Sequence, residues 1–62
     1  MSTVAELSSL RTSLTELTEK VTALAESLGG TRRDDVATSL FEVERTLTTA
    51  GRRLDRVLDD LR

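Results

Sequence analysis

The sequence of 62 residues contains no cysteine, no histidine and no proline, and its only aromatic residue is Phe41. Without cysteine the chain has no disulfide framework, no thiol nucleophile and no thiolate metal ligand. Without histidine it lacks the commonest general base and the usual transition-metal ligand. We therefore expect no catalytic residues, no bound metal and no cofactor, and we predict that the protein is not an enzyme.

A large charge of one sign is also lacking, since nine Lys and Arg residues face 11 Asp and Glu residues for a net charge of −2. This balance supplies no strong positive field, so we do not expect nucleic acid as a partner. The N-terminus has no basic segment followed by an apolar core, and no apolar run approaches the ~20 residues that span a bilayer. These features favour a cytoplasmic protein without membrane contact. Arginine supplies all the basic residues except Lys20, a bias that often accompanies GC-rich bacterial genes.

Few residues interrupt long helices, because proline is absent and glycine occurs three times. The pair Gly29-Gly30 lies near the middle of the chain, and Gly29 has the position of a left-handed residue that ends a helix. Thr3 followed by Glu6 has the spacing of a capping box, in which each side chain satisfies a free backbone N–H of a helix start. These residues predict one helix before the glycine pair.

A second helix start follows the glycine pair, where Thr31 and Asp34 repeat the capping spacing. Asp35 adds a negative charge where the helix dipole favours one. The sequence therefore predicts a single domain over residues 1–62, with a helix over about 4–28, a turn over 29–31 and a helix over about 32–61.

Apolar residues recur at alternating spacings of three and four along both helices. The first row consists of Leu7, Leu10, Leu14, Leu17, Val21, Leu24 and Leu28. The second row consists of Val36, Leu40, Val43, Leu47, Ala50, Leu54, Val57 and Leu61. Both rows are unbroken heptad patterns, and a 3.5-residue period predicts a left-handed coiled coil.

The two rows match one another if the chain folds back at the glycine pair. Antiparallel pairing then places Leu28 opposite Val36, and the same register places Leu14 opposite Ala50. A short turn makes the two helices neighbours. The predicted fold is therefore all-α: an antiparallel αα-hairpin, that is, a two-helix coiled coil.

One hairpin of this size buries little surface, and small scaffolds without disulfides or metals usually gain stability by oligomerising. Phe41 lies about 150° from the centre of the second row, so the neighbouring helix does not cover it. We predict contact with a second chain through residues of the second helix that lie outside the apolar row. These are Ala37, Phe41, Thr48, Gly51 and Leu58. The simplest assembly is a homodimer that forms a four-helix bundle, and another helical protein is the competing partner.

Three arginines of the second helix, Arg52, Arg53 and Arg56, form a candidate contact site for an anion or an acidic partner. A simpler interpretation is a solvated face with ion pairs, because Asp55 lies within helical reach of its arginine neighbours. The sequence thus predicts a non-enzymatic interaction or adaptor protein that self-associates through coiled-coil packing. The alternatives are a small regulator that binds a nucleotide, nucleic acid or acidic partner through these arginines, or a small subunit of a larger assembly.

Overall fold

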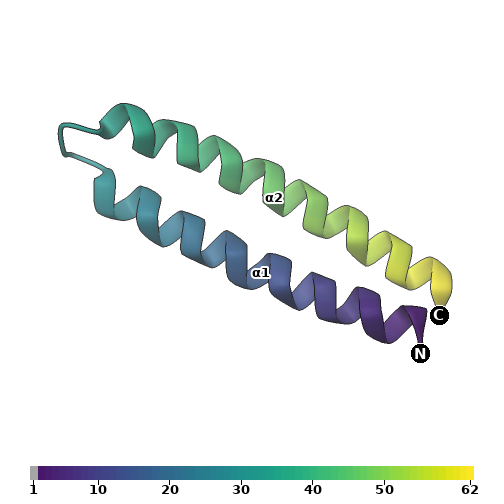
Figure 1. The fold of residues 1–62 in the computed structure, drawn as a ribbon. Coiled ribbons are helices and arrows are strands. Elements are labelled where there is room, and N and C mark those ends of the chain that lie inside the picture. Colours follow the sequence, from purple (N-terminus) through teal and green to yellow (C-terminus); the bar gives the residue numbers. More distant parts are fainter. Residues whose placement is uncertain (1) are drawn as a thin grey trace.

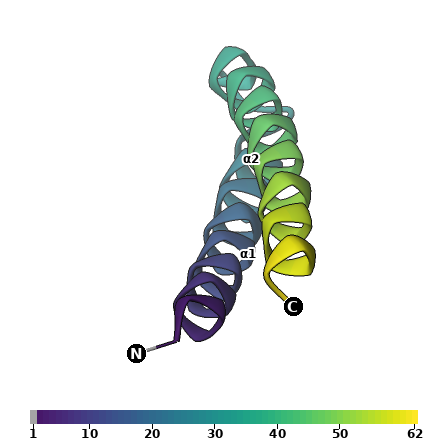
Figure 2. The same cartoon turned by 90° about the vertical axis from the view of Figure 1, so that its right-hand side faces the viewer.

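Two long helices and the turn between them make up residues 2–62, which the computed structural model describes. Helix α1 spans Thr3–Leu28 and helix α2 spans Asp34–Leu61. The helices run antiparallel side by side, so both termini lie at one end of the molecule (Figure 1). A view at right angles shows that the two helices are inclined to one another (Figure 2). With extents of 47 × 16 × 10 Å the molecule is a rod, and the predicted all-α antiparallel hairpin is confirmed.

Ser2 forms the N-terminal cap of α1. Its backbone is extended, and its hydroxyl accepts a hydrogen bond from the N–H of Ala5 at 3.4 Å. Its carbonyl accepts from the N–H of Glu6 at 3.0 Å. The predicted capping box of Thr3 and Glu6 is therefore wrong by one residue, because Thr3 is already helical. Glu6 still places a negative charge in the first turn, where the helix dipole favours it.

The left-handed residue of the turn is Gly30, with φ of +76°, and not Gly29 as the sequence predicted. Gly29 has an extended backbone, and its N–H still donates to the carbonyl of Ala25 at 3.1 Å. The chain leaves the helix at Gly29 and reverses its direction one residue later. Gly30 is the position at which a residue with a side chain would be strained.

Thr31 and Asp34 hold the turn together, although not as the predicted capping box. The hydroxyl of Thr31 donates to the carbonyl of Leu28 at 2.6 Å and accepts from the N–H of Arg33 at 3.1 Å. The carboxylate of Asp34 accepts from the N–H of Gly30. These bonds extend the turn, so α2 begins at Asp34, two residues later than predicted. Arg33 precedes the helix without a side-chain cap.

Most of the buried residues between the two helices are small. Ala25 of α1 is fully buried, Ala37 of α2 is 4% exposed, and Gly51 is also buried. Leu58, at 5% exposure, is the one large side chain among the buried residues. In a molecule of two helices only the opposite helix covers these residues. Small residues let the two backbones approach closely along one side of each apolar row.

Of the 15 residues of the predicted coiled-coil seam, nine are half-buried and six are exposed. The half-buried residues are Leu7, Leu14, Val21 and Leu28 of α1 with Val36, Leu40, Leu47, Ala50 and Leu54 of α2. The exposed residues, with 44 to 58% of their surface in contact with solvent, are Leu10, Leu17 and Leu24 of α1 with Val43, Val57 and Leu61 of α2. The buried residues Ala25, Ala37, Gly51 and Leu58 lie beside this seam, so the contact between the helices extends to their side of it.

Candidate interaction surfaces

Gly51 makes room for a side chain of α1. A Cβ atom built on Gly51 would lie 2.9 Å from both Cζ and Nη1 of Arg11, closer than Cβ atoms pack. The predicted register places Gly51 opposite Ser13, whereas the side chain beside Gly51 is that of Arg11. The prediction that Gly51, Ala37 and Leu58 lie outside the hairpin contact is wrong, since α1 of the same chain covers all three.

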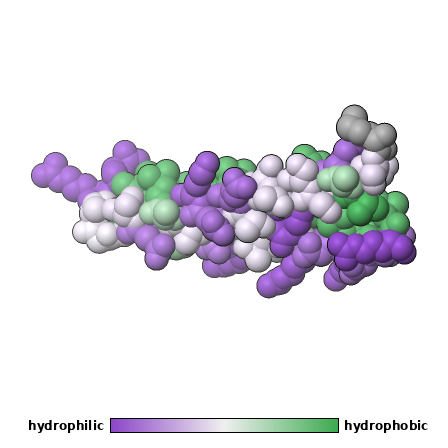
Figure 3. Space-filling view, turned by 90° about the horizontal axis from the view of Figure 1, so that it is seen from below, coloured by the Kyte–Doolittle hydropathy of each residue, from purple (hydrophilic) through white to green (hydrophobic). Residues whose placement is uncertain are grey.

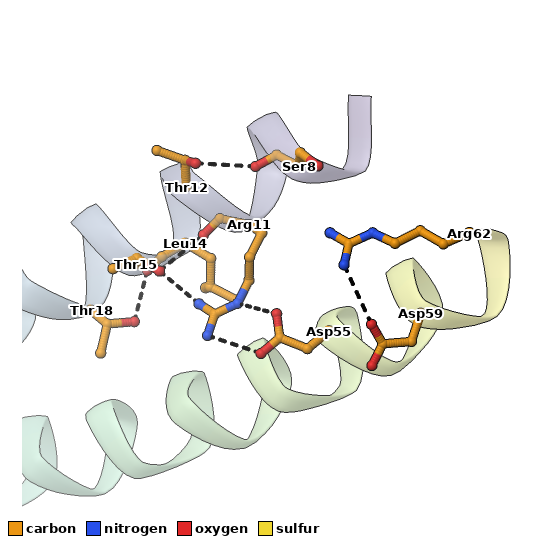
Figure 4. Close-up of polar contacts among 9 residues, drawn as sticks. All are labelled: Ser8, Arg11, Thr12, Leu14, Thr15, Thr18, Asp55, Asp59 and Arg62. Carbon is orange, nitrogen blue, oxygen red and sulfur yellow. Dashed lines mark hydrogen bonds and ion pairs between the residues drawn. The ribbon is translucent and has the colours of Figure 1, made fainter. Parts of the chain in front are cut away.

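Arg11 joins the two helices through a polar cluster (Figure 4). Its Nε lies 2.9 Å from Oδ1 of Asp55, and its Nη2 lies 3.4 Å from Oδ2 of the same carboxylate. Its Nη1 donates to the hydroxyl of Thr15 at 2.7 Å. The side chains of Arg11 and Asp55 are 32% and 51% exposed, so solvent screens this ion pair. The expected pairing of Asp55 with arginines of its own helix is wrong, because its partner comes from α1.

The sequence contains a signal for this cluster. Residues 4, 11, 18 and 25 lie at heptad spacing and form the side of α1 that faces α2, and Arg11 is the only charged residue among them. A long charged side chain in a contact row requires space and a counter-charge on the opposite helix. Gly51 supplies the space and Asp55 the charge.

Of the three predicted arginines, Arg52 lines a surface hollow that the other two do not line. Arg52, Arg53 and Arg56 are exposed, and none of them takes part in the ion pairs found in residues 2–62. Arg52 lines an open surface hollow together with Arg45, whereas neither Arg53 nor Arg56 lines it. Successive helical residues diverge by about 100°, so neighbours such as Arg52 and Arg53 face different directions.

Phe41 and Thr48 are both exposed, and both line the same hollow as Arg52. Phe41 is 38% exposed, less than the other large hydrophobic residues that reach the surface. Contact of Phe41 and Thr48 with a second chain stays a prediction.

A second surface lies on the opposite side of the hairpin. In each helix a second apolar row adjoins the half-buried central row on the side away from Arg11 and Gly51. This row is exposed in α1, whereas in α2 Val43 and Val57 are exposed and Val36 and Ala50 are half-buried. Because both rows lie away from Arg11 and Gly51, they emerge on one face of the antiparallel pair. We name this the apolar face, and it comprises Leu10, Leu17, Leu24, Val36, Val43, Ala50 and Val57.

Hydrophobic residues are unevenly spread over the molecule. Figure 3 shows one face, whose middle is covered by hydrophilic and near-neutral side chains. On this face hydrophobic side chains appear along the upper edge, near the end that carries the turn and at the end that carries the termini.

Among residues 2–62, no three His, Cys, Asp or Glu side chains gather closely enough to hold a metal ion. In the same part of the chain, neither helix combines the length and the apolar character that crossing a bilayer requires. The chain matches no protein-family model, and no curated protein or solved structure shows significant similarity to it.

Proposed function

We propose that this protein is a non-enzymatic interaction module that self-associates, as a homodimer in which two hairpins form a four-helix bundle, and that acts as an adaptor. The observation that carries the proposal is the exposed area. The chain of 6.8 kDa exposes 4,726 Å². A compact monomer of this mass exposes about 3,950 Å². The excess of about 780 Å² is close to the ~800 Å² that each partner buries in a standard interface.

The width of the apolar pattern also supports a bundle. A helix in a two-stranded coiled coil needs two apolar rows, whereas a helix in a bundle contacts two neighbours and uses three. In α1, the central leucine row is flanked on one side by Ala25 and Val4, which face α2. It is flanked on the other side by three exposed leucines. The third row has no partner within the hairpin.

The alternative function, a regulator that binds an anionic ligand, has one observation in its favour. Arg45 and Arg52 line a common hollow, although Glu44 lines it too and offsets part of their charge. A cytoplasmic location belongs to the proposal as well. So does a bacterial source, which the arginine bias supports.

The test of the proposal is the molar mass of the purified chain, measured by light scattering over a range of concentrations, with absorbance read at 260 nm. We expect about twice 6.8 kDa and little absorbance, since the chain contains no Trp or Tyr. A 6.8 kDa particle at all concentrations would contradict self-association. Strong absorbance at 260 nm would instead support the nucleotide or nucleic-acid alternative.

A further inference from the structure

We infer that a second copy of this chain docks on the apolar face of the hairpin and not on the face that carries Phe41. This inference rests on the proposed self-association and names the surface that performs it. The apolar face has the exposure that a partner would remove: Leu10 is 58% exposed, Leu24 53% and Leu17 50%. Across the face, Val43 and Val57 of α2 are each 44% exposed.

Charge is absent from the face itself. The chain has 20 charged residues, nine basic and 11 acidic, and none lies in the apolar face or in the central row beneath it. Interface cores are depleted of charged residues in the same way. The exposed leucines of α1 span two heptads, so the uncharged strip runs along about 21 Å of the rod.

The rim of the apolar face fits an identical copy. By helical spacing the rim consists of Glu6, Ser13, Lys20, Ser27, Ser39, Thr46, Arg53 and Asp60, all exposed. Four of these residues are small, so a second pair of helices can approach closely. The other four comprise two acidic and two basic residues and have no net charge. A second copy therefore meets no net repulsion at the rim.

The opposite face fits a second copy poorly. Three of the residues that the sequence assigned to the interface, Ala37, Gly51 and Leu58, are already covered by α1. The polar cluster of Arg11 and Asp55 lies on that side, and burying it would remove solvent from a half-exposed carboxylate. A lipid surface fits the apolar face less well than a protein does. Interfacial helices are rich in basic residues at their polar flanks, and this rim is neutral.

The experiment compares the dimer dissociation constants of the parent chain and three variants, measured by sedimentation. Leu17→Glu places a charge in the centre of the apolar face, Phe41→Glu places one on the other face, and Thr12→Glu is a control on the outer surface of α1. We expect Leu17→Glu to weaken the dimer by about 100-fold or more, because two-fold symmetry buries the charge twice. We expect Thr12→Glu and Phe41→Glu to leave the constant within about threefold of the parent value.

Two results would separate the failure of this inference from the failure of the proposed function. A parent chain that is monomeric throughout overturns both. A dimeric parent that Phe41→Glu dissociates and Leu17→Glu does not leaves self-association standing and overturns the docking face.

A second measurement avoids the risk that Leu17→Glu fails to fold. The chain has no cysteine, so single Leu17→Cys and Thr12→Cys variants each carry one reporter thiol. We expect alkylation of the Leu17→Cys thiol to slow at least tenfold as the protein concentration rises through the dissociation constant. The Thr12→Cys thiol should react at a constant rate. Equal rates for the Leu17→Cys thiol in monomer and dimer would overturn the inference.

Discussion

Substituting Gly51 by alanine should have two opposing effects on the free energy of unfolding. Alanine favours the helix, but its Cβ displaces the side chain of Arg11. Alanine in place of glycine inside a helix stabilises by about 1 kcal/mol. The new Cβ, however, would lie 2.9 Å from the Arg11 guanidinium, which must then move. Movement loosens the ion pair with Asp55, worth ~0.2–1 kcal/mol at this exposure, and the hydrogen bond to Thr15, worth ~0.5–1.5 kcal/mol. The losses offset the gain, so we expect Gly51→Ala to change the free energy of unfolding by less than about 0.5 kcal/mol.

Removing the Arg11 guanidinium should restore the stabilisation that alanine at position 51 brings to the helix. Arg11→Met keeps the apolar stem of the side chain and deletes the atoms that the new Cβ would meet. In this background we expect Gly51→Ala to stabilise by the full ~1 kcal/mol, which makes the coupling between the two sites about 1 kcal/mol. Urea unfolding of all four chains, followed by far-UV circular dichroism at one protein concentration, measures the cycle. An equal gain from Gly51→Ala in both backgrounds would refute the close approach of Arg11 to Gly51.

Three further substitutions test the contact and the turn. Ala25→Leu adds volume where the helices touch without space, and it should destabilise by ~1–3 kcal/mol in thermal or urea unfolding, whereas an unchanged stability would contradict the close contact. Gly30→Ala should destabilise by about 1 kcal/mol because of the positive φ, while Gly29→Ala, at an extended position with ordinary Cβ contacts, should not. Asp34→Ala removes the acceptor of the Gly30 N–H and should cost about 1 kcal/mol. The matched control Asp35→Ala, whose ion pair is exposed, should cost less than half of that, and equal losses would argue against the turn contact.

The hairpin is predictable from the sequence because its signals are local and periodic. The glycine pair and the heptad spacing place both helices to within two residues of their observed ends. The errors at the helix starts arise from competing capping groups. Ser2 and Thr3 are both good N-terminal caps, and Asp34 bonds to the N–H of Gly30 where a capping box would have used Thr31.

The side of the apolar row that faces the partner helix was not predictable from hydropathy. On one side of the central row of α1 lie Leu10, Leu17 and Leu24, and on the other lie residues as different as Arg11 and Ala25. Hydropathy selects the leucines, whereas the hairpin packs the mixed row, in which Ala25 fills little space and Arg11 occupies the space that Gly51 leaves. A polar residue in a contact row is compatible with packing only if the opposite helix supplies space and a partner. That condition depends on the register and not on either helix alone.

The most direct test of self-association is sedimentation equilibrium of the parent chain, with helicity measured on the same samples by circular dichroism. We predict a mass near twice 6.8 kDa at high concentration. Dilution should lower the mass and the helical signal together, because each hairpin alone buries only about half of its unfolded surface. A fully helical particle of 6.8 kDa at every concentration would contradict the account, since the hairpin would then be stable with its apolar face in water.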